Sequence, residues 1–146
     1  MNSSKMIIYM ADDDADDRYF MRQSLQKICQ SLTLVEAEDG TELLTMLETR
    51  SRELVCQPVN LILLDINMPK MNGFETLTAL KANPLLRHIP TVIVSTSDEP
   101  DQLNKAYQRG ASGFVKKPDT YEKMDQVAHS VCHFCSGSTS PFVQPW

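Results

Sequence analysis

Short apolar runs alternate along the chain with segments whose apolar side chains recur every three or four positions. The first pattern is typical of buried strands and the second of amphipathic helices. The pattern predicts strands at residues 5–11, 32–37, 59–64, 91–94 and 112–116. It predicts helices that begin after an N-cap at Asp14 and then at 41–50, 73–82, 101–109 and 120–133.

Five strand-helix units in series predict an α/β fold, a doubly wound parallel sheet with helices on both faces. The run from Val59 to Leu64 is nearly continuous in apolar residues, as expected for a strand that is buried on both faces. In such sheets ligands bind beyond the carboxyl ends of the strands. The residues that follow each strand are therefore the candidates for chemistry.

Polar residues stand at four of these strand ends. Asp12 and Asp13 follow the first strand, Asp65 the third, Ser95 the fourth and Lys117 the fifth. Carboxylates that converge in one crevice repel each other unless a cation is bound. Oxygen ligands without a neighbouring histidine or cysteine suit Mg²⁺, and a lysine opposite them suits a phosphoryl oxygen.

This set of side chains predicts phosphoryl transfer with a carboxylate as nucleophile. Asp65 would attack the phosphorus atom, while Mg²⁺ and Lys117 would neutralise charge on the phosphoryl oxygens. The product is an acyl phosphate, which is energy-rich and hydrolyses. The modification is therefore reversible and suits a switch.

Composition narrows the class of protein further. The chain has 146 residues, one domain's worth, and its formal net charge of −5 argues against nucleic acid as a partner. No apolar run approaches the roughly 20 residues that span a bilayer, and the N-terminus lacks a signal-peptide pattern, so we expect a cytoplasmic protein without membrane contact. Its four cysteines show no disulfide-framework spacing, and we expect reduced thiols.

The motifs together resemble the receiver domain of two-component response regulators, with the fold of the chemotaxis protein CheY. The resemblance covers about residues 5–134 and leaves 135–146 as a flexible C-terminal tail. It implies a flavodoxin-like (βα)5 sheet with strand order 2-1-3-4-5. The segments that carry it are Asp12-Asp13, Leu63-Leu64-Asp65-Ile66-Asn67-Met68-Pro69 with Gly73, Ser95, and 110–118.

The resemblance also implies roles around the metal. Asp65 would be the phosphoacceptor, Asp13 and Asp65 would bind Mg²⁺ directly, and Asp12 would bind it through water. The backbone carbonyl of Asn67 would be a further ligand. Asn67 and Ser97 flank the pocket, and we expect them to tune the lifetime of the phosphorylated state.

On the phosphoryl side, the resemblance implies that Ser95 and Lys117 contact the phosphoryl group. Phe114 matches the aromatic switch residue of the family, with an ordinary core aromatic as the alternative. The Lys117-Pro118 bond is usually cis in the family. We assign Asp16 and Asp17 to a solvated helix start, where the helix dipole favours negative charge.

After Lys117 only residues 118–146 remain, which predicts a stand-alone receiver that signals by altered partner binding. The phosphoryl source would be a phosphohistidine on a sensor histidine kinase or a histidine phosphotransfer protein. The chain looks most like the single-domain regulators paired with bacterial phytochromes, which often dimerise. Phe142 and Trp146 in the tail would then be candidates for a homodimer contact, with disorder as the alternative.

Two other functions stay open. An aspartyl-phosphate phosphatase normally carries a second Asp two residues after its nucleophile, and this chain has Asn67 there. A receiver-fold interaction module without phosphorylation is disfavoured by the complete set of acidic, Ser and Lys residues. A zinc site in the segment from His129 to Cys135 is disfavoured because its apolar residues form a core-facing helical stripe. We therefore expect no enzyme beyond self-phosphorylation and self-dephosphorylation.

Overall fold

The computed structural model describes residues 6–50 and 57–135. Strands and helices alternate through both ranges, as predicted. The strands are β1 (Met6–Ala11), β2 (Leu32–Ala37), β3 (Leu61–Asp65), β4 (Thr91–Ser95) and β5 (Gly113–Lys116). The helices are α1 (Ala15–Ile28), α2 (Gly40–Thr49), α3 (Gly73–Ala82), α4 (Pro100–Gln108) and α5 (Tyr121–Cys135). The predicted tail contact of Phe142 and Trp146 lies outside the described residues.

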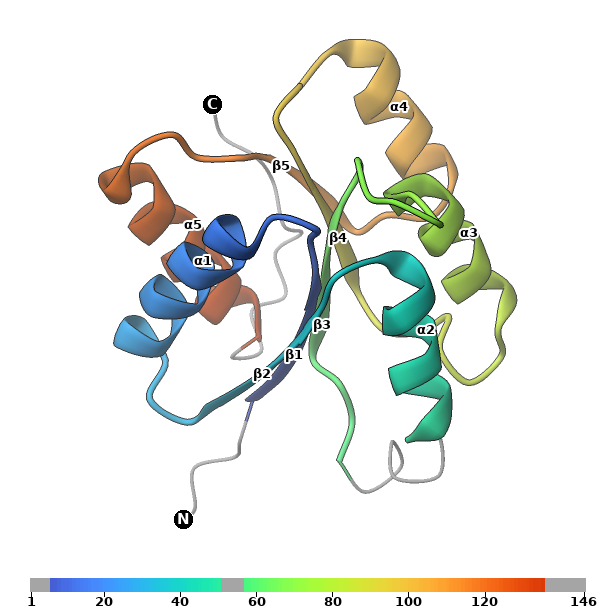
Figure 1. The fold of residues 1–146 in the computed structure, drawn as a ribbon, viewed down its shortest axis with the longest axis horizontal. Coiled ribbons are helices and arrows are strands. Elements are labelled where there is room, and N and C mark those ends of the chain that lie inside the picture. The colour runs from blue at the N-terminus through green and yellow to red at the C-terminus, as the bar shows by residue number, and fades with distance from the viewer. Residues whose placement is uncertain (1–5, 51–56, 136–146) are drawn as a thin grey trace.

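The five strands form one parallel sheet in the order β2-β1-β3-β4-β5. Helices α1 and α5 cover one face, and α2, α3 and α4 cover the other (Figure 1). The predicted α/β class and strand order are confirmed. Across the described ranges, no helix has both the length and the apolar character required to cross a lipid bilayer.

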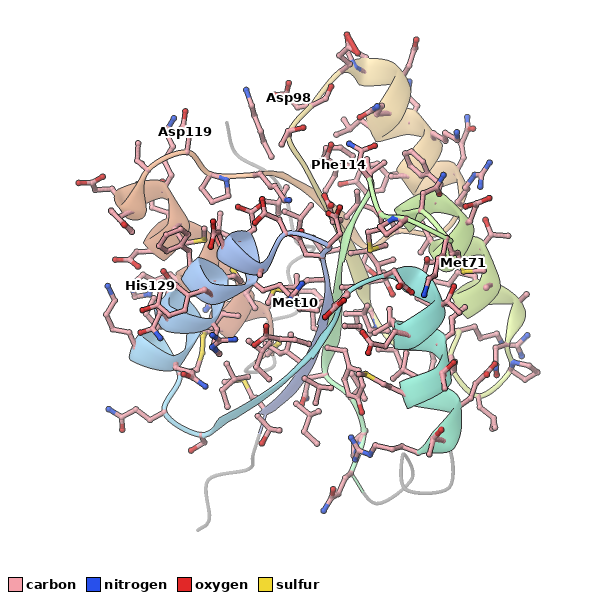
Figure 2. The ribbon with its side chains drawn as sticks, in the orientation of Figure 1. Met10, Met71, Asp98, Phe114, Asp119 and His129 are labelled. Atoms are coloured by element: carbon pink, nitrogen blue, oxygen red, sulfur yellow. A yellow bond between two sulfur atoms is a disulfide. The ribbon has the colours of Figure 1, made fainter. Side chains whose placement is uncertain are left out.

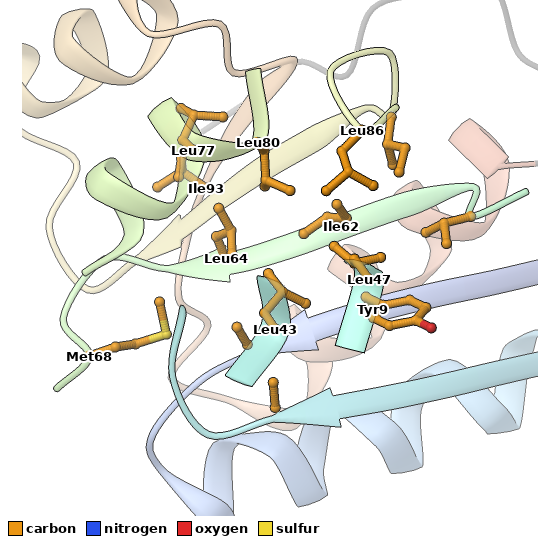
Figure 3. Packing of buried hydrophobic residues seen from close by; sticks show 14 of the residues in the cluster. Tyr9, Leu43, Leu47, Ile62, Leu64, Met68, Leu77, Leu80, Leu86 and Ile93 are labelled. Carbon is orange, nitrogen blue, oxygen red and sulfur yellow. The ribbon is translucent and has the colours of Figure 1, made fainter. Parts of the chain in front are cut away.

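Alternation along each strand divides the core into two clusters, one on each face of the sheet. On β1, Ile8 and Met10 pack toward α1 and α5, while Ile7 and Tyr9 pack toward α2 and α3. Figure 3 shows the second cluster, in which leucines of α2 and α3 meet the side chains of β3. The sheet is therefore buried on both faces, as a parallel sheet requires.

Side-chain caps begin each of the first three helices directly beyond a strand end or its loop. Asp14 accepts hydrogen bonds from the backbone N–H groups of Asp16 and Asp17. Asn72 and Glu75 form a reciprocal capping box at the start of α3. These caps satisfy N–H groups that have no partner within the helix. They also fix where the first turns stand relative to the strand ends.

A disulfide between Cys29 and Cys132 joins the end of α1 to α5, with the two Cα atoms 6.4 Å apart. Our expectation of reduced thiols is wrong for this pair. The two cysteines are 103 residues apart, and only the packing of α1 on α5 brings them together. Cys135 keeps a free thiol, and burial raises its pKa to about 11.

Candidate functional site

Four strand ends meet at one edge of the sheet. Because the strands are parallel and in register, Asp65 at the end of β3 lies beside β4, which ends at Ser95. Asp12 follows β1, and Lys117 follows β5, whose last residue pairs with Ser95. The loops that carry Asp98 and Asp119 rise from the same edge (Figure 2). The predicted meeting of side chains therefore occurs in the structure.

Three carboxylates share this edge. Asp12, Asp13 and Asp65 each offer an oxygen atom, and these oxygens lie within 4.8 Å of one another. Asp12 and Asp65 are buried, with 6% and 5% of their surface exposed, while Asp13 is exposed. Within residues 6–50 and 57–135, this is the one cluster of three or more such ligands. An all-oxygen, partly open set suits a hard divalent cation that keeps some of its water.

Lys117 faces the carboxylates from the opposite side. Its Nζ atom lies 2.9 Å from Oδ2 of Asp12 and 3.4 Å from Oδ1 of Asp65. Its backbone N–H donates to the carbonyl oxygen of Ser95 at 2.6 Å, which fixes the start of the β5–α5 loop against β4. The lysine side chain is only 14% exposed, so its charge acts in a site with little water.

Burial and charge together shift the ionisation of the site. Burial, followed by the charge of Asp12, raises the pKa of Asp65 to about 6, and Lys117 opposes that rise. Burial also raises the pKa of Asp12. At neutral pH, Asp65 is therefore mostly ionised, as a nucleophile must be.

The loop between β3 and α3 approaches Asp65 so closely that it requires glycine at position 73. The N–H of Gly73 donates to the carbonyl oxygen of Ile66 at 2.8 Å. A Cβ atom at this position would collide with the carbonyl oxygen of Asp65 and lie 2.9 Å from Cα of Ile66. The motif glycine therefore shapes the backbone that presents Asp65.

The sequence model of the response regulator receiver domain matches residues 8–129 of this chain. The chain belongs to the response regulator receiver family. Among its relatives, the chemotaxis protein CheY of Pseudomonas aeruginosa is 30% identical over 125 residues, which are 84% of this chain and 95% of CheY. Response regulator Rcp1 of Synechocystis is 28% identical over 133 residues, 91% of this chain and 90% of Rcp1.

Two further comparisons define the extent of the match. The phosphorylated cyanobacterial phytochrome response regulator RcpA superimposes with a TM-score of 0.82 at 25% identity, over 94% of this chain and 99% of RcpA. A probable cyclic di-GMP phosphodiesterase of Vibrio cholerae is 30% identical over 128 residues, 87% of this chain but only 26% of that protein. The receiver therefore spans about a quarter of that relative.

The remaining predicted residues of the receiver lie around this core of the site. Asn67 is exposed beyond the end of β3, and Ser97 is half-buried and donates its N–H to Oγ of Ser95 at 3.1 Å. Phe114 is fully buried in the cluster beneath α2, α3 and α4. This inward position fits the simple core aromatic that we kept as the alternative, and it leaves the predicted switch role as a proposal.

One implication of the family resemblance is wrong in this structure. Because the described residues contain no cis peptide bond, the Lys117-Pro118 bond is trans. The trans form is the more stable state of most X–Pro bonds, by roughly 0.5–1 kcal/mol. The ion pairs of Lys117 with Asp12 and Asp65 form with this trans bond.

Sequence reasoning also missed one residue of the receiver site. We assigned Asp17 to a solvated helix start, yet its Oδ2 atom accepts a hydrogen bond from Nζ of Lys117 at 2.7 Å. That distance is shorter than either of the lysine's other two ion pairs. No local pattern marks the contact, because the two residues are 100 positions apart.

Proposed function

We propose that this receiver accepts a phosphoryl group on Asp65 and signals by a change in partner binding. The observation that carries the proposal is the placement of a buried, ionised Asp65 between two further carboxylates and the ammonium group of Lys117. Burial and the neighbouring carboxylate destabilise the ionised form of Asp65, and the ion pair with Lys117 offsets only part of that cost, so a role in function is the better explanation for a carboxylate here. The shared receiver family supports that role.

In the proposed reaction, an oxygen of Asp65 forms a bond to the phosphorus atom as the bond from phosphorus to the donor's imidazole nitrogen breaks. The electron pair of that bond stays on the donor's nitrogen, and the imidazole leaves as neutral histidine because its other ring nitrogen carries a proton. Asp65 becomes an acyl phosphate. Lys117 stabilises the charge on the phosphoryl oxygens, and the hydroxyl of Ser95 donates a hydrogen bond to one of them. Attack of water on the phosphorus later restores the carboxylate and releases inorganic phosphate.

The three carboxylates fit Mg²⁺, because all their ligand atoms are oxygens and one of the three groups is open to solvent. Asp13 and Asp65 would bind the ion directly, Asp12 would bind it through water, and the backbone carbonyl of Asn67 would be a further ligand. When bound, the ion supplies positive charge for the phosphoryl oxygens. A solved structure of Rcp1, which has the same fold, is described as Mn²⁺-bound.

The partners follow from the same chemistry. The donor is a phosphohistidine on a sensor histidine kinase or phosphotransfer protein, and the description of RcpA as a phytochrome response regulator makes a phytochrome-type kinase our specific candidate. Phe114 would couple the site to the face formed by α4, β5 and α5, and a downstream protein would read that face. Asn67 and Ser97 would set the lifetime. We place the receiver at 5–134, with a tail at 135–146, in the cytoplasm.

Intact mass spectrometry tests the proposal directly. The protein is incubated with acetyl phosphate and Mg²⁺, and we expect the mass of one phosphoryl group to appear. The Asp65→Asn variant should stay unmodified. Asp98→Asn removes an exposed carboxylate from a loop at the same edge and should be labelled like the wild type.

The outcomes separate the alternatives. Label that persists in Asp65→Asn, or a wild type that takes up none, overturns the proposal. Steady release of phosphate from a small phosphoester would indicate an aspartyl-phosphate phosphatase instead, whereas labelling with one phosphoryl group per chain and no steady turnover would exclude that enzyme.

A further inference from the structure

Asp17 is the carboxylate nearest to the lysine of the site. Its Oδ2 atom is 2.7 Å from Nζ of Lys117, against 2.9 Å for Asp12 and 3.4 Å for Asp65. Asp17 belongs to the first turn of α1, which the cap at Asp14 holds in place through the N–H of Asp17 at 3.3 Å. The helix start therefore directs a carboxylate at the lysine from outside the metal cluster.

The ammonium group of Lys117 has three N–H donors, and three carboxylates already face it. Phosphorylation of Asp65 replaces the single charge of its carboxylate with the roughly two negative charges of a phosphoryl group, so about one further negative charge stands next to this ammonium. One of the existing contacts must then lengthen. Asp17 is the most exposed of the three partners, with 40% of its side chain open to solvent, so its hydration recovers most easily when the contact breaks.

The surroundings leave room for a small movement of the lysine. Beneath the ion pairs, a cavity of about 30 Å³ is lined by Met10, Met21 and Met124 among others, together with Asp17 and Lys117. That volume is about the size of one water molecule. Burial lowers the pKa of Lys117, but its hydrogen bonds to Asp17 and Asp12, together with the charges of Asp12 and Asp65, raise it by more, so the ammonium is charged.

We infer that Asp17 is a positioning residue for Lys117: it competes with the phosphoryl group for the ammonium and so limits the rate at which Asp65 is phosphorylated. This inference rests on the proposed function of Asp65. The first turn of α1 then has a kinetic role. The strength of the Asp17–Lys117 ion pair sets the fraction of molecules in which the ammonium group is free to bind the incoming phosphoryl group.

The test compares rates of label uptake from acetyl phosphate at fixed Mg²⁺ by intact mass. A partly exposed ion pair contributes up to about 1 kcal/mol, so Asp17→Asn should take up label about two- to five-fold faster than the wild type, which corresponds to about 0.4–1 kcal/mol. Asp16→Asn removes the same charge from an exposed side chain in the same turn, and its rate should stay within about 1.5-fold. Asp17→Glu keeps the carboxylate and should restore a rate near that of the wild type.

A second readout does not depend on phosphorylation. The ¹H–¹⁵N signal of the Lys117 ammonium should shift in Asp17→Asn and stay in place in Asp16→Asn. Equal rates in the two Asn variants, or slower uptake in Asp17→Asn, overturn the inference and leave the proposed function standing. Absence of label in every variant overturns the proposed function, and this inference with it.

Discussion

The helices on the two faces of the sheet are held together by different kinds of contact. One layer consists of α1 and α5, and the other of α2, α3 and α4 (Figure 1). Between α1 and α5, Oγ of Ser24 donates to Asp125 at 2.9 Å, Lys27 pairs with the same carboxylate, and the Cys29–Cys132 disulfide crosses from one helix to the other. These polar and sulfur contacts stand beside an apolar cluster. Their strength depends on pH, salt and redox conditions.

The layer of α2, α3 and α4 is held mainly by apolar packing, to which Arg109 after α4 adds hydrogen bonds to the carbonyl oxygen of Phe74 and to Oγ1 of Thr78 in α3. Its cluster is made of leucine, isoleucine and other apolar side chains, and glycines allow the closest approaches. A Cβ atom at Gly40 would collide with Oγ1 of Thr76, as one at Gly73 would with the backbone of Asp65. The site lies between the two layers. On one side, the close packing of Gly73 against the backbone of Asp65 positions that residue. On the other side, the ion pair with Asp17 in α1 positions Lys117.

The largest expected effect comes from disrupting the close packing at Gly73. Gly73→Ala forces a methyl group into the carbonyl oxygen of Asp65, so we expect a loss of about 3 kcal/mol in the free energy of unfolding. Urea denaturation measures it. Thr78→Ser, at an exposed position of the same helix, keeps the hydroxyl that bonds to Phe74 and Arg109 and should change stability by less than about 0.5 kcal/mol. A loss below about 1 kcal/mol for Gly73→Ala would mean that the loop adapts to the methyl group.

Reduction of the disulfide tests the other layer. The bond closes a segment of 103 residues, and such cross-links stabilise a fold by about 2–4 kcal/mol. We expect the free energy of unfolding of the oxidised protein to fall by that amount when a reducing agent is added. Cys135→Ser should leave the difference unchanged, since Cys135 is outside the bond. If Cys29→Ser unfolds like the oxidised wild type without reductant, the cross-link has no share in stability.

The free energy of unfolding should depend on pH through Asp65, which lies between the two helical layers. In the folded protein the pKa of Asp65 is raised from 3.8 to about 6, so its ionised form destabilises the fold. That cost is absent below the pKa of Asp65 in the unfolded chain. It grows as pH rises from about 4 to about 6, and it is fully present above the pKa of the folded protein. In EDTA, Asp65→Asn should therefore be more stable than the wild type by about 1–3 kcal/mol at pH 8, and by little at pH 4.

Thermal or urea unfolding at several pH values gives this difference. Asp98→Asn, on an exposed loop, should show no difference that grows with pH. If the difference in the free energy of unfolding between Asp65→Asn and the wild type stays constant from pH 4 to pH 8, folding does not raise the pKa of Asp65.

The sequence predicts the parts of this receiver that have local signals. Leu32–Ala37 and Gly73–Ala82 have the predicted bounds, because an apolar run and a pair of helix stop residues mark them. Asp65 and Lys117 could be placed at the site because Asp65 ends an apolar strand, Lys117 directly follows another, and parallel strands bring their ends together. The third strand begins later than predicted, at Leu61, because Asn60 uses its side-chain oxygen to accept the N–H of Ile7.

The contacts that sequence reasoning missed are those between distant residues of α1 and the C-terminal part of the fold. Helical periodicity shows which face of α1 is buried, but it does not show which side chain of the β5–α5 segment lies opposite Asp17 or Cys29. Those pairings depend on how far α5 is shifted along α1. That offset is set by the packing of the whole apolar cluster between them.

The smallest expected effect concerns the loop that leads from Asp65 to α3. Lys70 has φ of 67°, in the left-handed region that favours glycine. Its side chain is exposed and lies 3.9 Å from Asp39, so its charge adds little to stability. Lys70→Gly and Lys70→Ala both remove that side chain, but only glycine relieves the backbone, and we expect it to be more stable than the alanine variant by about 1 kcal/mol. Urea denaturation of the two variants measures the difference. Equal stability would mean that the backbone of the loop between β3 and α3 is not strained at position 70.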